Sequence, residues 1–347
     1  MGSYRLAAET CECLQKWKFG WNGMMSYEIA VIGNDEAAFE VLFLAAASGK
    51  RTVAILPELR HSAWLVGKAF RSLISDLLVD RTPARKRMFA TSGTPRLLRT
   101  LVARAVAHET RTHVQVLQKL GVDVLLGEAR FESQNDVTVA QAAVNRRDSM
   151  TSRHIVIGTG IRRTAMHRPL GLMPFHRPEA LFAGRRLPGS VCIVGGSDFG
   201  IGLASLVALF GVDTRLVARE DTASVALELA HAAGVQIGNH PSEIGIRNLG
   251  EPFSNLRADV VDCRRSVGFT QHLNLEVVNV EPDENGQLWC AENFETWCSD
   301  IFGVGDVVGF SPDTALDPVI QAERVMNRIV HALPRPHLSR QFVAASK

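Results

Sequence analysis

Residues 27 to 38 read Tyr-Glu-Ile-Ala-Val-Ile-Gly-Asn-Asp-Glu-Ala-Ala. The apolar run 29–32 is typical of a buried parallel strand, and Gly33 ends it. Small and apolar residues then recur at helical spacing over 37–46, and a second apolar run follows at 52–56. The stretch therefore predicts a β-α-β unit, the building block of doubly wound α/β folds.

A second unit of the same kind begins at residue 190. Its expected parts are a strand over 190–194, a turn over 195–200, a helix over 201–210 and a strand over 214–218. At roughly 150 residues per domain, the length of 347 residues suggests about two domains. We therefore predict an α/β chain with two Rossmann-like dinucleotide-binding domains.

The sequence between the two units also carries element signals. Residues 68–120 read as mostly helical, 121–126 as a strand, 131–144 as a hairpin and 153–157 as a strand.

Composition excludes several classes of protein. Apolar residues make up 46% and charged residues 21%, which excludes a disordered, collagen-like or small disulfide-stapled chain. With 38 basic and 36 acidic residues, the chain has too little net charge to indicate binding to nucleic acid or to an anionic membrane. The apolar stretch 199–212 is too short to span a bilayer. Residues 1–25 resemble a leader without signal-peptide features, and the six cysteines are scattered, so we expect a cytoplasmic protein with reduced thiols and no metal site.

The first turn departs from the Gly-x-Gly-x-x-Gly pattern of a dinucleotide site. Gly33 keeps the first position, and Ala38 is a tolerated residue at the third. Asp35 at the second adds a side chain and a negative charge where bare backbone should approach a diphosphate. A carboxylate here is expected to cap the helix and take the N–H groups that an anion would use. Dinucleotide sites usually have a ribose-binding acid at the end of the second strand. Here Pro57 occupies that position, and Glu58 follows one residue later.

The second turn keeps more of the pattern. Gly195 and Gly200 hold the first and third positions, and Ser197 is a small, uncharged replacement at the second. After the next strand, Arg219 could face the 2′-phosphate of NADP or lie on the surface beside Glu220.

Other short motifs stand in an order that the two turns alone do not explain. In that order the chain resembles the FAD-dependent pyridine nucleotide-disulfide oxidoreductase family, most closely its soluble pyridine nucleotide transhydrogenase branch, over roughly residues 27–333. The motifs that carry the resemblance, besides the two turns, are Gly-Glu-Ala-Arg-Phe at 127–131, Ile-Gly-Thr-Gly at 157–160, Ala-Asp at 258–259, Leu-Asn-Leu-Glu at 273–276, Asn-Gly-Gln-Leu at 285–288 and Ile-Phe-Gly-Val-Gly-Asp-Val-Val-Gly at 301–309.

This resemblance implies an interrupted arrangement. Residues 26–165 and 271–334 would form an FAD-type domain, and 166–270 an NAD(P)-type domain inserted in it, with a tail over 335–347. Carried over to this sequence, the residues implied at the cofactors are Gly33 at the diphosphate, Ala129 at adenine, Thr159 and Gly160 near the FAD, Gly305 where the strand end approaches it, and Asp306 at the ribityl chain.

Departures from the family pattern are equally specific. The redox-active Cys-x4-Cys is absent from its expected region, residues 60–68. Lys68 resembles the family's lysine near the flavin and is the one catalytic candidate, but its usual acidic partner falls at Gly202. The glycine-arginine segment that ends the family's NAD domain is altered at 264–268. We expect the chain to lack the family's C-terminal dimerisation domain.

Two functions from different classes remain open at this point. One is an FAD-dependent NAD(P)H oxidoreductase, transhydrogenase-like, that moves hydride between NAD(P)H and flavin. The other is a non-catalytic or single-nucleotide-binding descendant that acts as a binding or scaffold module, which Asp35 and Pro57 favour. The expected partners are a nicotinamide nucleotide and a second copy or another protein, without nucleic acid or a membrane span.

Overall fold

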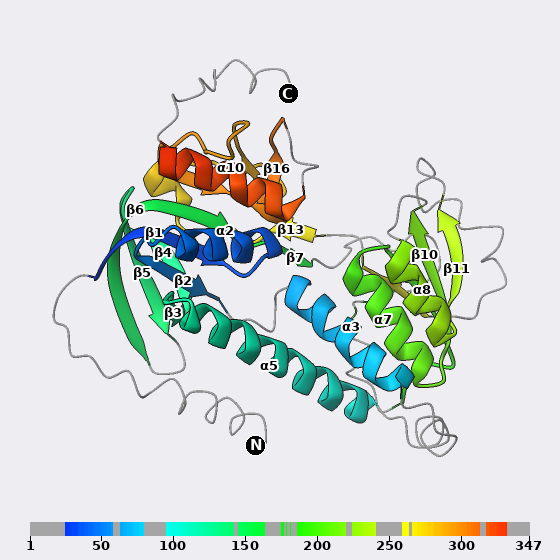
Figure 1. The fold of residues 1–347 in the computed structure, drawn as a ribbon. Coiled ribbons are helices and arrows are strands. Elements are labelled where there is room, and N and C mark those ends of the chain that lie inside the picture. The colour runs from blue at the N-terminus through cyan, green and yellow to red at the C-terminus, as the bar shows by residue number, and fades with distance from the viewer. Residues whose placement is uncertain are drawn as a thin grey trace.

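The computed structural model shows two α/β lobes (Figure 1). The expected leader (apart from Met25), the expected tail, and Glu58 lie outside the residues that the structure describes. Those residues are 25–57, 63–79, 95–141, 145–163, 175–176, 178, 181, 186–219, 224–240, 259–263, 266–312 and 317–331.

The first lobe is built on a seven-stranded sheet of order β3-β2-β1-β6-β5-β4, with β15 added beside β6. The strands from β3 to β6 in this order pair in parallel, β4 and β5 are antiparallel, and β15 is parallel to β6. The bounds are β1 Met25–Gly33, β2 Thr52–Leu56, β3 Asp123–Leu126, β4 Glu128–Phe131, β5 Asp136–Gln141, β6 Arg146–Gly158 and β15 Ile301–Gly303.

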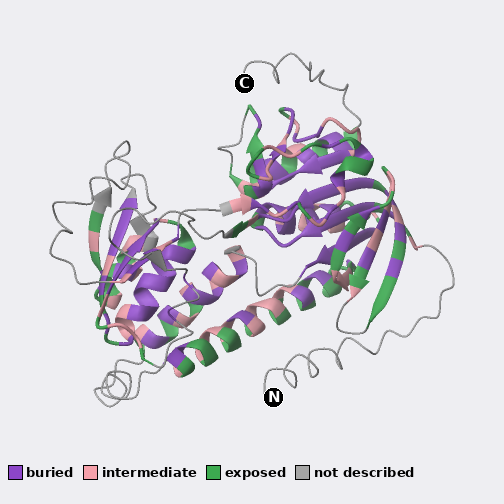
Figure 2. Cartoon of the chain, turned by 180° about the vertical axis from the view of Figure 1, so that it is seen from behind, coloured by how far each residue is buried: buried purple, intermediate pink, exposed green. Residues whose placement is uncertain are grey.

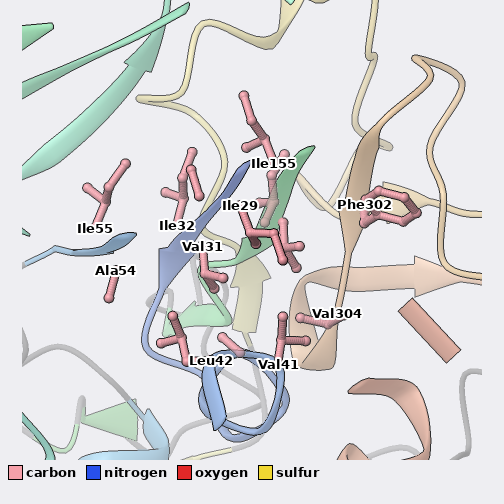
Figure 3. Close-up of a cluster of buried hydrophobic side chains, with 14 of the residues drawn as sticks. Ile29, Val31, Ile32, Val41, Leu42, Ala54, Ile55, Ile155, Phe302 and Val304 are labelled. Atoms are coloured by element: carbon pink, nitrogen blue, oxygen red, sulfur yellow. The ribbon is translucent and has the colours of Figure 1, made fainter. Parts of the chain in front are cut away.

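Helix α2 (Glu36–Ala47) packs on this sheet, and α10 (Pro318–His331) packs on α2. Figure 3 shows β1 and α2 side chains meeting in the interior, where Ile29, Val31 and Leu42 are fully buried. Val304 reaches the same cluster from the C-terminal part of the chain. The last third of the sequence therefore completes the core that its first third begins.

The second lobe has a five-stranded parallel sheet of order β11-β10-β9-β12-β8. Its helices are α7 (Asp198–Leu209) and α8 (Ser224–Ala233). Because β15 returns to the first sheet after this lobe, the predicted pair of Rossmann-like folds, one inserted in the other, is confirmed. The strands are β8 Phe175–His176, β9 Ser190–Val194, β10 Asp213–Arg219, β11 Gln236–His240 and β12 Asp259–Asp262.

The buried residues form two main interiors, one for each lobe (Figure 2). Helix α3 (Ala63–Val79) lies between α5 (Pro95–Lys119) and α7, and the Phe70 ring on α3 lies 5.2 Å from the Phe199 ring on α7. Leu98 near the start of α5 belongs to the second interior, and Leu117 near its end to the first. The two helices thus tie the lobes together.

Small elements complete the connections. Strand β7 (Ile161–Arg163) pairs antiparallel with β13 (Ser266–Gly268) where the chain leaves and re-enters the first lobe. Strand β14 (Leu288–Trp289) pairs with β16 (Val308–Phe310), and the 3-10 turns are η4 (Leu275–Val278) and η5 (Gly305–Val307).

Strand β6 is longer than the sequence predicted, starting at Arg146 instead of Arg153. Its first half alternates exposed and buried residues because it pairs antiparallel with β5 and faces solvent on one side. Its second half is continuously buried between β1 and β15. Within the described part of the chain, no helix is both long and apolar enough to cross a membrane.

Candidate nucleotide-binding site

The first turn (residues 33–38) connects β1 to α2 at the end of the sheet where β6 also stops. Gly33 has φ +126°, and a Cβ there would collide with the carbonyl group of Gly158. The Asp35 N–H donates to the Gly158 carbonyl oxygen at 3.1 Å. The strand ends of β1 and β6 are therefore held as close as bare backbone permits.

Ala38 stands where the dinucleotide pattern prefers its third glycine. The structure explains why the replacement is accepted: a Cβ on Gly158 would lie only 2.5 Å from the Cβ of Ala38. The glycine that close packing requires is on the facing strand. The sequence predicted that alanine is tolerated at position 38, but not that this requires glycine at position 158.

Asp35 is the N-cap of α2, as predicted. Its Oδ1 accepts a hydrogen bond from the Ala37 N–H at 3.1 Å. Its Oδ2 accepts a second, of 3.2 Å, from the Asp306 N–H in η5, which the sequence did not reveal. One carboxylate thus joins the helix N-terminus to a loop from the far end of the chain.

The electrostatics of Asp35 are unfavourable for its charged form. The residue is 8% exposed, and burial is the main reason why its pKa is raised from 3.8 to about 7. The negative charge of Asp306 raises it further, as does Glu36, while the two amide hydrogen bonds lower it.

Two glycines with positive φ enclose the Asp35 carboxylate. Gly160 has φ +65°, and a Cβ there would lie 3.2 Å from Asp35 Oδ2. Gly305 has φ +72°, and a Cβ there would collide with the carboxylate. The Gly305 N–H donates to Oε1 of the buried Gln321 on α10 at 2.8 Å, and Gln287 Nε2 donates to the Asp306 carbonyl oxygen at 3.1 Å.

Neither glutamine was singled out from the sequence. Gln321 belongs to the amphipathic helix α10, where a buried polar residue among apolar positions was the available signal. Gln287 lies in the motif at 285–288, whose sequence gives no sign of a hydrogen bond to η5.

The remaining residues expected at FAD gather near this point or on the same sheet. Thr159 is buried directly after β6, and its hydroxyl has no hydrogen-bond partner among the described residues. Asp306 is exposed in η5, and Ala129 is buried on β4. The glycines and the free Thr159 hydroxyl fit a flat cofactor that threads between strand ends. The Asp35 carboxylate is the exception, since it holds amides that a diphosphate needs.

The second turn (residues 195–200) has a backbone that requires glycine at two positions. Gly195 has φ +133°, and a Cβ on Gly200 would collide with the Gly195 carbonyl oxygen, so this turn does require its third glycine. Ser197 is the N-cap of α7, and its Oγ accepts from the Gly200 N–H at 3.3 Å. A hydroxyl at this position adds no charge.

An ion pair that the sequence did not predict lies at the second turn. Arg71 on α3 pairs with Asp198 in the first turn of α7. It places a positive charge beside the acid at the start of α7. Arg219 ends β10, the strand next to β9, and only its backbone is described.

The structure places Lys68 against α5. Its Nζ lies 3.2 Å from His113 Nε2 and 5.3 Å from the centroid of the Trp64 ring. The pKa of His113 is lowered, and burial is the largest cause. The position expected to carry an acidic partner, Gly202, packs against the Phe70 side chain, where a Cβ would lie 2.8 Å from the Phe70 Cβ.

The described thiols do not form a redox pair. Cys192 and Cys290 are buried, and burial raises their pKa values to about 11 and about 12. Cys263 is also buried, and Cys298 is half-buried with a raised pKa. None of these four cysteines, the ones that the structure describes, is in a disulfide.

Comparison with known proteins identifies the family and the fold of the chain. The family model for pyridine nucleotide-disulphide oxidoreductases matches residues 27–333. The chain is 24% identical over 322 residues to the soluble pyridine nucleotide transhydrogenase of Pseudomonas fluorescens (strain SBW25), which covers 82% of this chain and 67% of that protein. It is 27% identical over 323 residues, with the same coverages, to the protein of that name from Chromohalobacter salexigens.

Solved structures share the fold. The flavoprotein disulfide reductase RclA from Escherichia coli, in its Cu(II) complex, matches with a TM-score of 0.60 at 18% identity, over 88% of this chain and 71% of that one. LpdA from Mycobacterium tuberculosis matches with a TM-score of 0.56 at 17% identity, over 89% and 72%.

The extent of the family match settles the classification. It covers both turns, both sheets and the returning segment that ends in α10. Members of this family are oxidoreductases, and its flavoproteins use FAD and NAD(P)H. The chain belongs to the pyridine nucleotide-disulphide oxidoreductase family.

Proposed function

We propose that this protein is an FAD-dependent NAD(P)H oxidoreductase of the transhydrogenase type, which passes hydride from one nicotinamide nucleotide to another. The observation that carries the proposal is the pair of glycine-built turns, at Gly33 in the first lobe and Gly195 in the second, tied together by α3 and α5. The relatives named soluble pyridine nucleotide transhydrogenase support it.

The first lobe would hold FAD. Gly33, Gly160 and Gly305 would let the cofactor approach backbone, Ala129 would lie at its adenine, and the Thr159 hydroxyl would gain a hydrogen-bond partner. Asp306 is exposed and would accept from ribityl hydroxyls. When bound, the flavin supplies the hydride-accepting and hydride-donating chemistry.

The second lobe would hold the nicotinamide nucleotide. The N-terminus of α7 would face its diphosphate, with Ser197 as an uncharged cap and Gly200 allowing helix and strand to approach. Arg71 would balance the charge of Asp198 there, and Arg219 would stand at the end of β10, where NADP carries its 2′-phosphate.

The described thiols favour hydride transfer between nicotinamide nucleotides over disulfide reduction. The buried Cys192 and Cys290 are held protonated by their surroundings, and a thiol in that state is a poor nucleophile. Hydride transfer between stacked rings needs no acid–base residue, so Lys68 is not required by the proposal and remains a candidate for positioning.

An assay of hydride transfer from NADPH to thio-NAD⁺ by the FAD-supplemented protein tests this function. We expect reduction of thio-NAD⁺ that depends on FAD and weakens in Asp306→Ala. Reduction of dyes or quinones without any reduction of thio-NAD⁺ would overturn the transhydrogenase assignment. Binding of NADPH without retention of FAD would instead identify a single-nucleotide binder.

We also propose that the protein is cytoplasmic and forms a homodimer. None of the described cysteines is in a disulfide, which supports a reducing compartment. Exposed apolar side chains on α10, Val319, Ile320 and Val330, support contact with a second copy. Light scattering of the purified chain tests the dimer, and a monomeric mass at working concentration would exclude it.

A further inference from the structure

The Asp35 carboxylate lies in the cradle that the first dinucleotide turn builds. We propose that it is a built-in competitor for the diphosphate of FAD: it holds the amides of Ala37 and Asp306 in the free chain and must be displaced when FAD binds. This inference rests on the proposed use of FAD and concerns how that site is regulated.

The hydrogen bonds show what the carboxylate replaces. Its two oxygens accept from N–H groups 3.1 and 3.2 Å away, one at the start of α2 and one in η5. A phosphate oxygen is stabilised by the same groups as a carboxylate oxygen, namely oriented N–H donors and the positive end of a helix. Asp35 therefore satisfies from within the chain the donors that an anionic ligand would use.

The space around the carboxylate is the second line of argument. Gly160 and Gly305 both adopt positive φ and present bare backbone to it. Glycine at such positions allows a close approach of another group. Here the approaching group is Asp35 itself, and a Cβ on Gly305 would collide with it. The cradle cannot hold the carboxylate and a diphosphate together.

Charge works in the same direction. Asp306 and Glu36 both act on Asp35 with negative charge. A diphosphate entering the first turn would therefore meet three carboxylates, of which only Asp35 occupies the amides. Removing that one carboxylate frees two donors and removes the nearest repulsion.

Equilibrium FAD binding, followed by quenching of flavin fluorescence, measures the competition. We expect Asp35→Gly to bind FAD at least about tenfold more tightly than the wild type, since charge-assisted hydrogen bonds of this kind affect affinity by that much or more. Asp35→Asn keeps the volume without the charge and is expected to lie between the two. Glu36→Gln, which removes an exposed charge from the same turn, is the matched control and should change affinity far less.

Inorganic pyrophosphate provides a readout that is independent of flavin. It should raise the melting temperature of Asp35→Gly and leave that of the wild type unchanged. Equal effects on both proteins, including no effect on either, would overturn the inference, as would equal FAD affinities when both proteins bind FAD. If pyrophosphate stabilises only the variant but no protein binds FAD, the competitor role stands and the proposed FAD function falls.

Discussion

The backbone N–H of Asp306 donates a hydrogen bond of 3.2 Å to Oδ2 of Asp35, across 271 positions of sequence. The bond closes the first lobe, because α2 follows the first strand of the sheet and η5 follows the last. It also puts two acidic residues side by side at the end of the sheet where we propose that FAD binds. In the proposed account, this contact of the free chain competes with the cofactor.

The stability of the free protein should depend on pH through Asp35. Its pKa is raised from 3.8 to about 7 by burial, then by Asp306 and Glu36. Between these values the folded chain holds a proton that the unfolded chain gives up, so the free energy of unfolding falls as pH rises through this window. Asp35→Asn does not titrate. In urea titrations from about pH 4 to pH 8, the wild type should lose stability relative to this variant, and parallel pH profiles would contradict the account.

Gly158 and Ala38 should behave as a coupled pair. Gly158→Ala brings two Cβ atoms to within 2.5 Å and also crowds Val304, so it should destabilise the chain by about 1–3 kcal/mol. Ala38→Gly in the same chain should recover part of that loss in a double-mutant cycle of urea denaturation. Gly189→Ala, where a Cβ meets open space, is the control. Strictly additive effects would show that the two residues do not meet.

Gln321 should be needed to hold the turn at Gly305. Gln321→Met keeps most of the volume but leaves the Gly305 N–H without its 2.8 Å acceptor, at a cost of about 1–3 kcal/mol in unfolding free energy. Gln115→Met on the exposed face of α5 should change stability by less than about 0.5 kcal/mol. Equal changes in the two variants would remove Gln321 from this role.

Local patterns in the sequence predicted much of the fold. The apolar runs at 29–32 and 190–194 and the helices after them form the two β-α-β units as expected. These predictions succeed because buried parallel strands are continuous apolar runs and the turns between strand and helix need glycine. The early start of β6 was missed because half of that strand faces solvent, so its pattern alternates instead of staying apolar.

The site was predicted in part. Asp35 was expected to cap α2, and it does, because an N-cap depends only on the two residues that follow. Its second bond to Asp306, the support from Gln321 and the pairing of Arg71 with Asp198 were not predicted. Each joins segments brought together only by the closed fold, and no spacing in the sequence records such a meeting.

Anaerobic titration of the FAD-loaded wild-type protein with NADPH and with NADH tests whether the two lobes work as one enzyme. If FAD in the first lobe receives hydride from a nucleotide in the second, the visible absorption of the oxidised flavin will be lost in proportion to added nucleotide, to an end point near one nucleotide per flavin. A bound flavin that stays oxidised in excess NADPH and NADH would contradict that conclusion.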